Sequence, residues 1–340
     1  MKLSNNLFYN GFMLDLIKTK KHALIFSHQG PDGDSVGSSV SLSLYLTKIG
    51  INNKIIFPDH YPNFLSWMSG LENSLVATDN LQLVFDLYNK SDLIFCLDFN
   101  HRSRLGNDLN KIISNSNDKY VIVLDHHTNP ENFGDFEIID EKASSTSELV
   151  FNFIVSNGDL KLIDIPISEA IYTGLITDTG SFKYDSVSSS THLVASKLKD
   201  VGLNHVEVHN KIFDQNSVSK INLLGYALQK IKIDSESSLA YLVLSEKELS
   251  KFNYKKGDSE GFVNFCLSIE GIENAAFLRE DKELIKMSFR SKGKVKVNEF
   301  SRKYYGGGGH INAAGGAIKK SDLNKVINEL IQNFRSFCSV

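Results

Sequence analysis

The chain is poor in the residues that build disulfide frameworks, and it has no apolar run near the roughly 20 residues that span a bilayer. Among its 340 residues are only three cysteines, five prolines and one tryptophan. Cys96 and Cys266 lie in apolar runs and Cys338 is far from both, so we expect reduced thiols rather than disulfides or a zinc cluster. The first residues also lack the apolar core and cleavage site of a signal peptide. We therefore expect a cytoplasmic protein without a membrane partner.

A strong excess of positive charge is also missing. The net charge is −3, with 20 Lys and Arg against 28 Asp and Glu over residues 1–236, and 17 against 12 from Ser237 onward. Proteins that grip long duplex nucleic acid usually carry a strongly basic surface, so the charge argues against such a partner. The acidic front part suits the binding of cations. The mildly basic rear part suits a small anionic ligand.

The first half of the chain alternates short apolar runs with helical patterns. The runs lie at 22–28, 53–57, 92–99 and 119–127, and the helical patterns lie at 35–49, 63–70 and 81–89. Short, nearly continuous apolar runs are typical of strands buried on both faces. Their alternation with helices predicts the α/β class, with a parallel sheet and helices on both of its faces.

A chain of this length is too long for one comfortable core, so we expect two domains. Helical patterns at 144–158 and 166–178 are followed by a mainly helical stretch over 188–234. Strand patterns then lie at 237–245, 275–278 and 284–289, and helical patterns at 261–270 and 322–334. We predict a first domain over 1–214, a helical linker over 215–236 and a smaller α/β domain over 237–340. The active site is expected in the cleft between the two domains.

Acidic and histidine side chains follow the ends of several predicted elements. They are His28, Asp32, Asp34, Asp98, Asp125, His126 and Asp178. Functional groups gather beyond the carboxyl ends of parallel strands, and so many converging carboxylates would repel one another unless cations neutralise them. Carboxylate and imidazole ligands without thiolates suit Mn²⁺ best and are compatible with Mg²⁺, Fe²⁺ or Co²⁺. Two ions about 3.5 to 4 Å apart would need about this many ligands, with one bridging carboxylate.

Four ordered motifs resemble those of the DHH phosphoesterase superfamily. They read "SHQGPDGDSVGSS", "LDFNHRSRLG", "VLDHHTNP" and "TDTGSF". Three later segments, "GFVNFCLSIEGIENAAF", "KMSFRS" and "GGGGHINAAGG", resemble the DHHA1 substrate domain. The resemblance covers about residues 20–320 and is nearest to the NrnA-like branch of oligoribonucleases and phosphatases of pAp (3′-phosphoadenosine 5′-phosphate). It implies that residues 1–214 bind metal and that residues 237–340 bind substrate.

The resemblance implies roles for individual residues of the first domain. The implied metal ligands are His28, Asp32, Asp34, Asp98, His126 and Asp178, with Asp98 as the bridge. The implied catalytic residues are Asp98, His101, Arg104 and His127, of which Arg104 would offer its planar fork of donors to phosphate. Asp125 would orient His126 or the strand end. A hydrogen-bonded core histidine is the alternative for His127, and a solvated loop residue is the alternative for Arg102.

The glycine-rich stretch "YYGGGGHINAAGG" points to a second group of substrate contacts. Four glycines followed by a histidine describe a tightly packed backbone that can aim N–H groups at a phosphate. The expected substrate-binding residues are Arg290, Ser291, Gly307, Gly308, Gly309 and His310. Tyr304 and Tyr305 could stack on a base, although packing in the core is the stronger expectation for at least one of them.

The implied activity is the hydrolysis of very short oligoribonucleotides to mononucleotides and of pAp to AMP, by activation of water at two divalent ions. One alternative is the hydrolysis of linear or cyclic dinucleotides, pyrophosphate or short polyphosphate at the same site. Another is a non-catalytic nucleotide-binding module, which would be expected to lack at least one metal ligand, whereas all six are present. A homodimer is compatible with the sequence.

Overall fold

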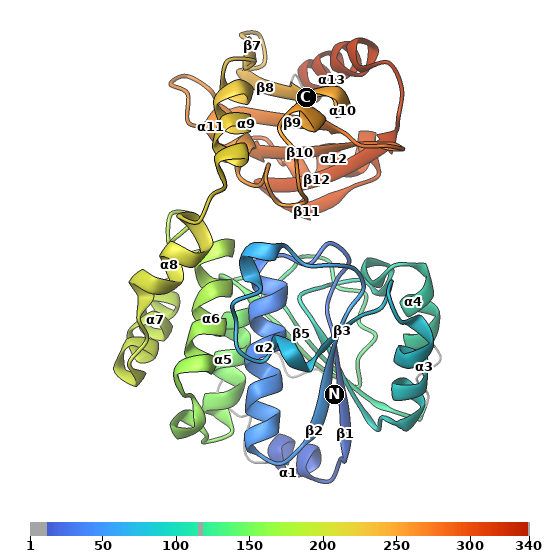
Figure 1. Ribbon diagram of the computed structural model, residues 1–340, viewed down its shortest axis with the longest axis vertical. Coiled ribbons are helices and arrows are strands. Elements are labelled where there is room, and N and C mark those ends of the chain that lie inside the picture. The colour runs from blue at the N-terminus through green and yellow to red at the C-terminus, as the bar shows by residue number, and fades with distance from the viewer. Residues whose placement is uncertain (1–11, 115–117, 339–340) are drawn as a thin grey trace. The chain divides into compact units, whose positions relative to one another are not determined.

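The structure is a computed structural model that describes residues 12–114 and 118–338 (Figure 1). The chain divides into two compact units, residues 1–215 and 216–340. Within the described ranges, no helix combines the length and the apolar character that a membrane span requires.

The first unit is built around a six-stranded sheet in which every neighbouring pair of strands is parallel. Its strands are β1 (His22–Phe26), β2 (Asn52–Phe57), β3 (Ser74–Val76), β4 (Leu93–Leu97), β5 (Tyr120–Asp125) and β6 (Phe136–Ile139). Their order is β3-β2-β1-β4-β5-β6, so the chain runs outward on one side of β1 and returns to its other side with β4. Such a reversal is the place where α/β sheets bind ligands.

Helices cover both faces of this sheet, which confirms the predicted fold class (Figure 1). One face carries α1 (Phe12–Lys18), α2 (Gly33–Lys48), α5 (Thr146–Ser156) and α6 (Ile165–Asp178), extended by α7 (Ser189–Val201) and α8 (His205–Phe213). The other face carries α3 (Leu81–Lys90) and α4 (Asn107–Ile113). Residues of β1 alternate between the two cores: Ile25 packs in one and Phe26 in the other, both fully buried. Burial on both faces explains why the central strands are continuous apolar runs.

Three details of the first unit differ from the sequence prediction. The helix expected over 63–70 is a single 3-10 turn, Asn63–Leu65, and Gly70 has a φ of 104° that no regular helix allows. The strands β3 and β6 were not predicted. They lie at the two edges of the sheet and most of their side chains are partly exposed, so their sequences lack a continuous apolar run.

The second unit contains a mixed six-stranded sheet. Its strands are β7 (Lys232–Asp234), β8 (Leu239–Leu244), β9 (Asn274–Glu280), β10 (Leu284–Ser291), β11 (Gly308–His310) and β12 (Ala313–Lys319), in the order β11-β12-β10-β9-β8-β7. Only β8 and β9 are parallel. The helices are α9 (Val218–Leu228), α10 (Glu246–Lys251), α11 (Phe262–Leu267), α12 (Val297–Tyr305) and α13 (Leu323–Cys338).

Residues 215–236, which the sequence suggests as a linker, contribute instead to the core of the second unit. This segment holds α9 and β7. Leu223 and Ala227 on α9 are fully buried and pack in one apolar cluster with Leu242 of β8 and Phe262 of α11. The sequence pattern of α9 shows a helix, but it cannot show that its apolar face is covered by strands that follow it.

Two helices of the first unit approach each other so closely that they require glycine. A Cβ on Gly37 of α2 would overlap the carbonyl oxygen of Ala170 on α6, and it would lie 3.0 Å from the backbone nitrogen of Gly174. Both neighbours are backbone atoms, which cannot rotate away as a side chain can. The spacing of α2 and α6 therefore depends on the missing side chain at residue 37.

We predict that Gly37→Ala lowers the free energy of unfolding by about 1–3 kcal/mol, because an added methyl group must push the two helices apart. Gly225→Ala in α9 is the matched control, since a Cβ there would meet nothing within 4 Å. That control should be neutral or stabilising by up to about 1 kcal/mol, because alanine favours the helix. Urea denaturation followed by circular dichroism measures both changes. Equal stabilities of the two variants would contradict the close approach.

Candidate metal centre

The six predicted metal ligands of the first unit lie together. His28 follows β1, Asp98 follows β4 and His126 follows β5, so all three stand beyond the carboxyl ends of adjacent strands. The other three come from helices on one face: Asp32 and Asp34 at the start of α2, and Asp178 at the end of α6. The reversal of strand order between β1 and β4 is what brings these segments to one edge.

One group of potential ligands is made by His28, Asp32 and Asp98. His28 Nε2 lies 3.8 Å from Asp32 Oδ2 and 3.4 Å from Asp98 Oδ2. The other ring nitrogen of His28 donates to the carbonyl oxygen of Gln29 at 2.9 Å, which leaves the Nε2 lone pair facing the carboxylates. Asp32 Oδ1 caps α2 by accepting from the N–H of Asp34 and Ser35, so Oδ2 stays available.

A second group is made by Asp34, His126 and Asp178. His126 Nε2 lies 3.9 Å from Asp34 Oδ2 and 3.4 Å from Asp178 Oδ2. Its Nδ1 donates to the carbonyl oxygen of Ala143 at 3.2 Å, which again turns Nε2 toward the carboxylates.

Asp98 lies between the two groups. Its Oδ2 is 3.4 Å from His28 Nε2, and its Oδ1 is 3.6 Å from His126 Nε2. The residue is 2% exposed and has a φ of 66°, a left-handed conformation that is uncommon for residues other than glycine. Its N–H donates to the carbonyl oxygen of Leu124 on the neighbouring strand. Each oxygen of one carboxylate thus faces a different group of ligands, as a bridging ligand requires.

The charges of this site are strongly coupled. Burial, together with the neighbouring charges of Asp34 and Asp32, raises the pKa of Asp98 well above its ordinary value. Burial also raises the pKa of Asp34. For His126, burial disfavours the charged ring, but four carboxylates outweigh it and raise the pKa to about 9. These carboxylates are those of Asp178, Asp98, Asp34 and Asp125. The buried carboxylates of the site therefore favour positive charge beside them, as a proton or as a cation.

The residues fit divalent cations. Their available atoms are carboxylate oxygens and imidazole nitrogens, which suit Mn²⁺, Mg²⁺, Fe²⁺ and Co²⁺. Within each of the two groups these atoms lie within 4.8 Å of one another. The second ring nitrogens of both histidines are held by backbone carbonyls, which is the usual arrangement around a metal-binding histidine.

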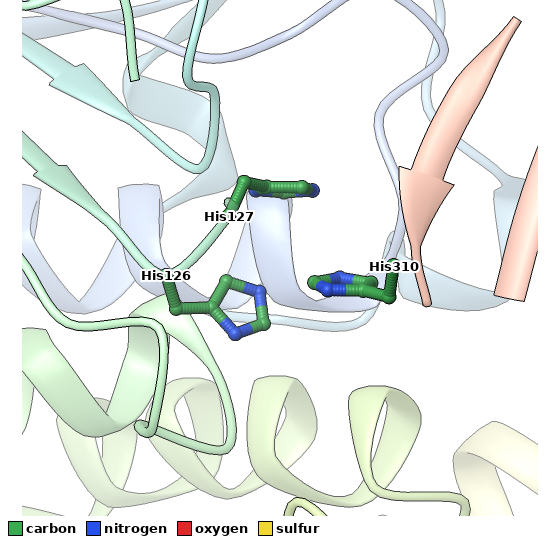
Figure 2. Close-up of side chains that lie close together, drawn as sticks. All are labelled: His126, His127 and His310. Carbon is green, nitrogen blue, oxygen red and sulfur yellow. The ribbon is translucent and has the colours of Figure 1, made fainter. Parts of the chain in front are cut away.

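The two histidines that follow β5 have different partners. Figure 2 shows the side chains of His126 and His127, whose rings are 5.0 Å apart and inclined by 71°. His127 Nδ1 donates to Asp125 Oδ1 at 2.7 Å, so Asp125 orients His127. The sequence instead suggests that Asp125 orients His126 or the strand end. Nε2 of His127 takes no part in the bond to Asp125.

The sequence does not predict that the backbone N–H groups of Thr146 and Ser147 belong to the site, but both donate to Asp34. The sequence predicts a helix over 144–158, but it does not show that the start of this helix contacts Asp34.

Two arginines follow Asp98. Arg102 pairs with Glu131, whereas the charge of Arg104 acts on the candidate metal centre. Arg102 donates from Nε and Nη2 to Glu131 at 3.0 and 2.7 Å, and it lies over the ring of Phe133. His101 Nδ1 lies 4.0 Å from the same glutamate. The carbonyl oxygen of Arg104 accepts from the N–H of Gln29 at 2.7 Å. Burial and the positive charge of Arg104 lower the pKa of His28, so the Arg104 guanidinium acts on the candidate metal centre.

The expected substrate residues of the second unit gather at one end of its sheet. Arg290 on β10 and His310 on β11 are both paired with Ala313 of the strand between them. The glycine-rich segment, for which the sequence predicts a tightly packed backbone, forms the hairpin β11–β12. A Cβ on Gly307 would overlap the carbonyl oxygen of Gly315, and a Cβ on Gly309 would overlap the carbonyl oxygen of Ala313. Both carbonyls belong to β12, which confirms that this backbone is tightly packed.

Other polar groups near that hairpin are already engaged. Ser291 Oγ donates to the carbonyl oxygen of Val295 at 2.7 Å and lies 3.1 Å from Asn312 Oδ1. Tyr305 is buried and stacks on Phe289, and Tyr304 packs against Phe300. Packing in the core, rather than stacking on a base, therefore accounts for Tyr305.

Comparison with known proteins agrees with this architecture. Residues 22–175 match the DHH family, N-terminal domain, and residues 236–336 match the DHHA1 domain. The probable bifunctional oligoribonuclease and PAP phosphatase NrnA of Streptococcus mutans serotype c is 26% identical over 319 residues, which cover 94% of this chain and 96% of that protein. The bifunctional oligoribonuclease and PAP phosphatase NrnA of Bacillus subtilis is 27% identical over 300 residues, which cover 88% and 90%.

One solved structure is similar over both units. An exopolyphosphatase-related protein from Bacteroides fragilis is 35% identical, with a TM-score of 0.91 and coverage of 96% of each chain. The order of the two domains, the parallel sheet and the convergence of the ordered motifs at its edge all lead to the same assignment. This chain belongs to the DHH family and carries a DHH domain followed by a DHHA1 domain.

Proposed function

We propose that this chain is a metal-dependent phosphoesterase that hydrolyses very short oligoribonucleotides to mononucleotides and pAp to AMP. The observation that carries the proposal is the position of Asp98, whose two oxygens face two separate groups of potential metal ligands. The substrate class comes from the similar proteins, which are named bifunctional oligoribonucleases and PAP phosphatases.

Two divalent ions, of which Mn²⁺ suits the donors best, would be held by the two groups with Asp98 shared between them. When bound, such ions lower the pKa of water and offset the charge that develops on a phosphoryl group. The first ion would contact His28, Asp32 and Asp98. The second would share Asp98 with the first and would also contact Asp34, His126 and Asp178.

Two further side chains of the first unit would act on the phosphate. Asp125 accepts from Nδ1 of His127, and this bond fixes which ring nitrogen carries the proton. The neutral ring would then present the lone pair of Nε2, which would accept a hydrogen bond from a hydroxyl of the substrate or from water. Protonation of the ring would make Nε2 a donor to a phosphate or leaving-group oxygen. The Arg104 guanidinium, together with His101, would offer donors to the charge that grows in the transition state.

The second unit would bind the rest of the substrate. Arg290 and His310, at the same end of the sheet, would contact a phosphate or base, and the backbone of Gly307, Gly308 and Gly309 lies beside them. The Ser291 hydroxyl is engaged within the unit, so its contribution would be to hold the backbone next to Arg290.

A second candidate is the hydrolysis of pyrophosphate or short polyphosphate at the same centre. The name of the Bacteroides fragilis protein, exopolyphosphatase-related, favours it. The same metal centre could serve either substrate, so a comparison of substrates must decide.

We predict that the protein with Mn²⁺ cleaves pGpG and releases phosphate from pAp, and that it leaves pyrophosphate and a 24-nucleotide RNA largely intact. Asp98→Asn keeps the size and the left-handed backbone conformation of the residue but removes the bridging charge, so both activities should fall more than about 100-fold. Ion-exchange chromatography of the products measures all four reactions. Cleavage of pyrophosphate or the long RNA alone would overturn the proposal.

Arg290→Ala should raise KM for pGpG about tenfold, since a hydrogen bond to a charged group is lost, and leave the content of bound metal unchanged. Lys286→Ala is the matched control, because Lys286 is an exposed cation on the same strand that pairs with Asp281. Steady-state kinetics and metal analysis test both variants. A loss of metal from the Arg290 variant would show that this arginine has another role.

Mn²⁺ affinity should rise with pH between 7 and 9, by up to about tenfold per pH unit for each proton released. The reason is the His126 pKa of about 9: below that pH the cation-free ring is protonated, and an ion must displace the proton. The raised pKa of Asp98 acts in the same direction. Titration calorimetry in buffers of different ionisation enthalpy measures affinity and proton release. A constant affinity across this range would contradict the assignment of His126 as a ligand.

A further inference from the structure

Thr146, the first residue of α5, donates to two different metal-ligand candidates. Its backbone N–H donates to Asp34 Oδ2 at 2.6 Å, and its Oγ1 donates to Asp98 Oδ1 at 2.9 Å. Thr146 is fully buried. One residue therefore connects a carboxylate at the start of α2 with the carboxylate that follows β4.

The side-chain bond acts on the final torsion of the Asp98 side chain. The final torsion of an aspartate side chain is broad, so the plane of its carboxylate is easily turned. Each carboxylate oxygen accepts at about two positions. When the Thr146 hydroxyl occupies one position on Oδ1, the carboxylate plane is fixed and the other position stays directed toward the centre, where His126 Nε2 lies at 3.6 Å.

A buried carboxylate, that of Glu148, holds the residues around Thr146. Glu148 Oε2 accepts from the N–H and Oγ of Ser144, and from Oγ1 of Thr191 on α7. The side chain of Ser145 caps α5 by accepting from the N–H of Glu148. Glu148 is 3% exposed and Thr191 is fully buried. Ser144, Ser145 and Glu148 are thus fixed by hydrogen bonds that do not involve the metal ligands, whereas the N–H of Ser147 donates to Asp34.

We propose that Thr146 is a positioning residue that sets the orientation in which Asp98 bridges the two ions. The inference rests on the proposed function for its catalytic consequence. The effect on metal affinity, however, can be measured on the cation-free protein without any substrate.

The test compares Thr146→Val with Thr146→Ser. Valine keeps the size and the backbone N–H but loses the donor to Asp98, whereas serine retains the hydroxyl. Calorimetric titration of the full chain with Mn²⁺ should show an affinity about tenfold weaker for the valine variant, and an affinity within about twofold of the unchanged chain for the serine variant. With pGpG as substrate, kcat should fall for the valine variant while KM stays unchanged.

Thr173→Val is the matched control. Thr173 is also fully buried, and its hydroxyl donates to the carbonyl oxygen of Glu169 within α6 instead of to a metal ligand. Loss of the Thr173 hydroxyl should change the melting temperature without changing Mn²⁺ affinity. Equal Mn²⁺ affinities for Thr146→Val and the unchanged chain would overturn the inference, and so would equal losses in Thr146→Val and Thr173→Val. If the unchanged chain binds Mn²⁺ but cleaves no nucleotide, the proposed function fails and the affinity comparison still decides the role of Thr146.

Discussion

The repulsion among four carboxylates at one edge of a sheet is the constraint on which the first unit depends. Asp32, Asp34, Asp98 and Asp178 cannot all be charged and close together unless something offsets them, and burial together with this repulsion raises the pKa values of Asp34 and Asp98. The fold supplies part of the compensation through backbone N–H groups at the starts of α2 and α5. Cations would supply the rest. The reversal of strand order at β1 and β4 is what allows both helix starts to face the same point.

The parts of this site that the sequence predicts are those encoded by contiguous residues. The buried strands are continuous apolar runs, and the ligands follow them within a few positions, so both were recognised. The bonds from Thr146 to Asp98 and Asp34 join residues 48 and 112 positions apart, and no local pattern encodes them. The edge strands β3 and β6 were missed because a partly exposed edge needs no continuous apolar run.

The glycine-rich segment of the second unit shows how one composition can serve two structures. Consecutive glycines are most often found in flexible loops, whereas here Gly308 and Gly309 belong to the edge strand β11 and pair with β12, in line with the tight packing that the sequence predicts. The glycines are required because the backbones are too close for side chains at Gly307 and Gly309. Backbone packing, rather than flexibility, explains the composition. It also keeps His310 in register with Ala313, beside Arg290.

The order of the ligands along the chain has a consequence for synthesis. The group formed by His28, Asp32 and Asp98 is complete once the first four strands have been made, whereas the second group waits for Asp178 at the end of α6. Domains fold as units while the chain leaves the ribosome. A nascent chain that ends between these points therefore lacks Asp178, and its second group of ligands is incomplete. The first unit reaches its full set of ligands only when α6 has been made and packs on the sheet.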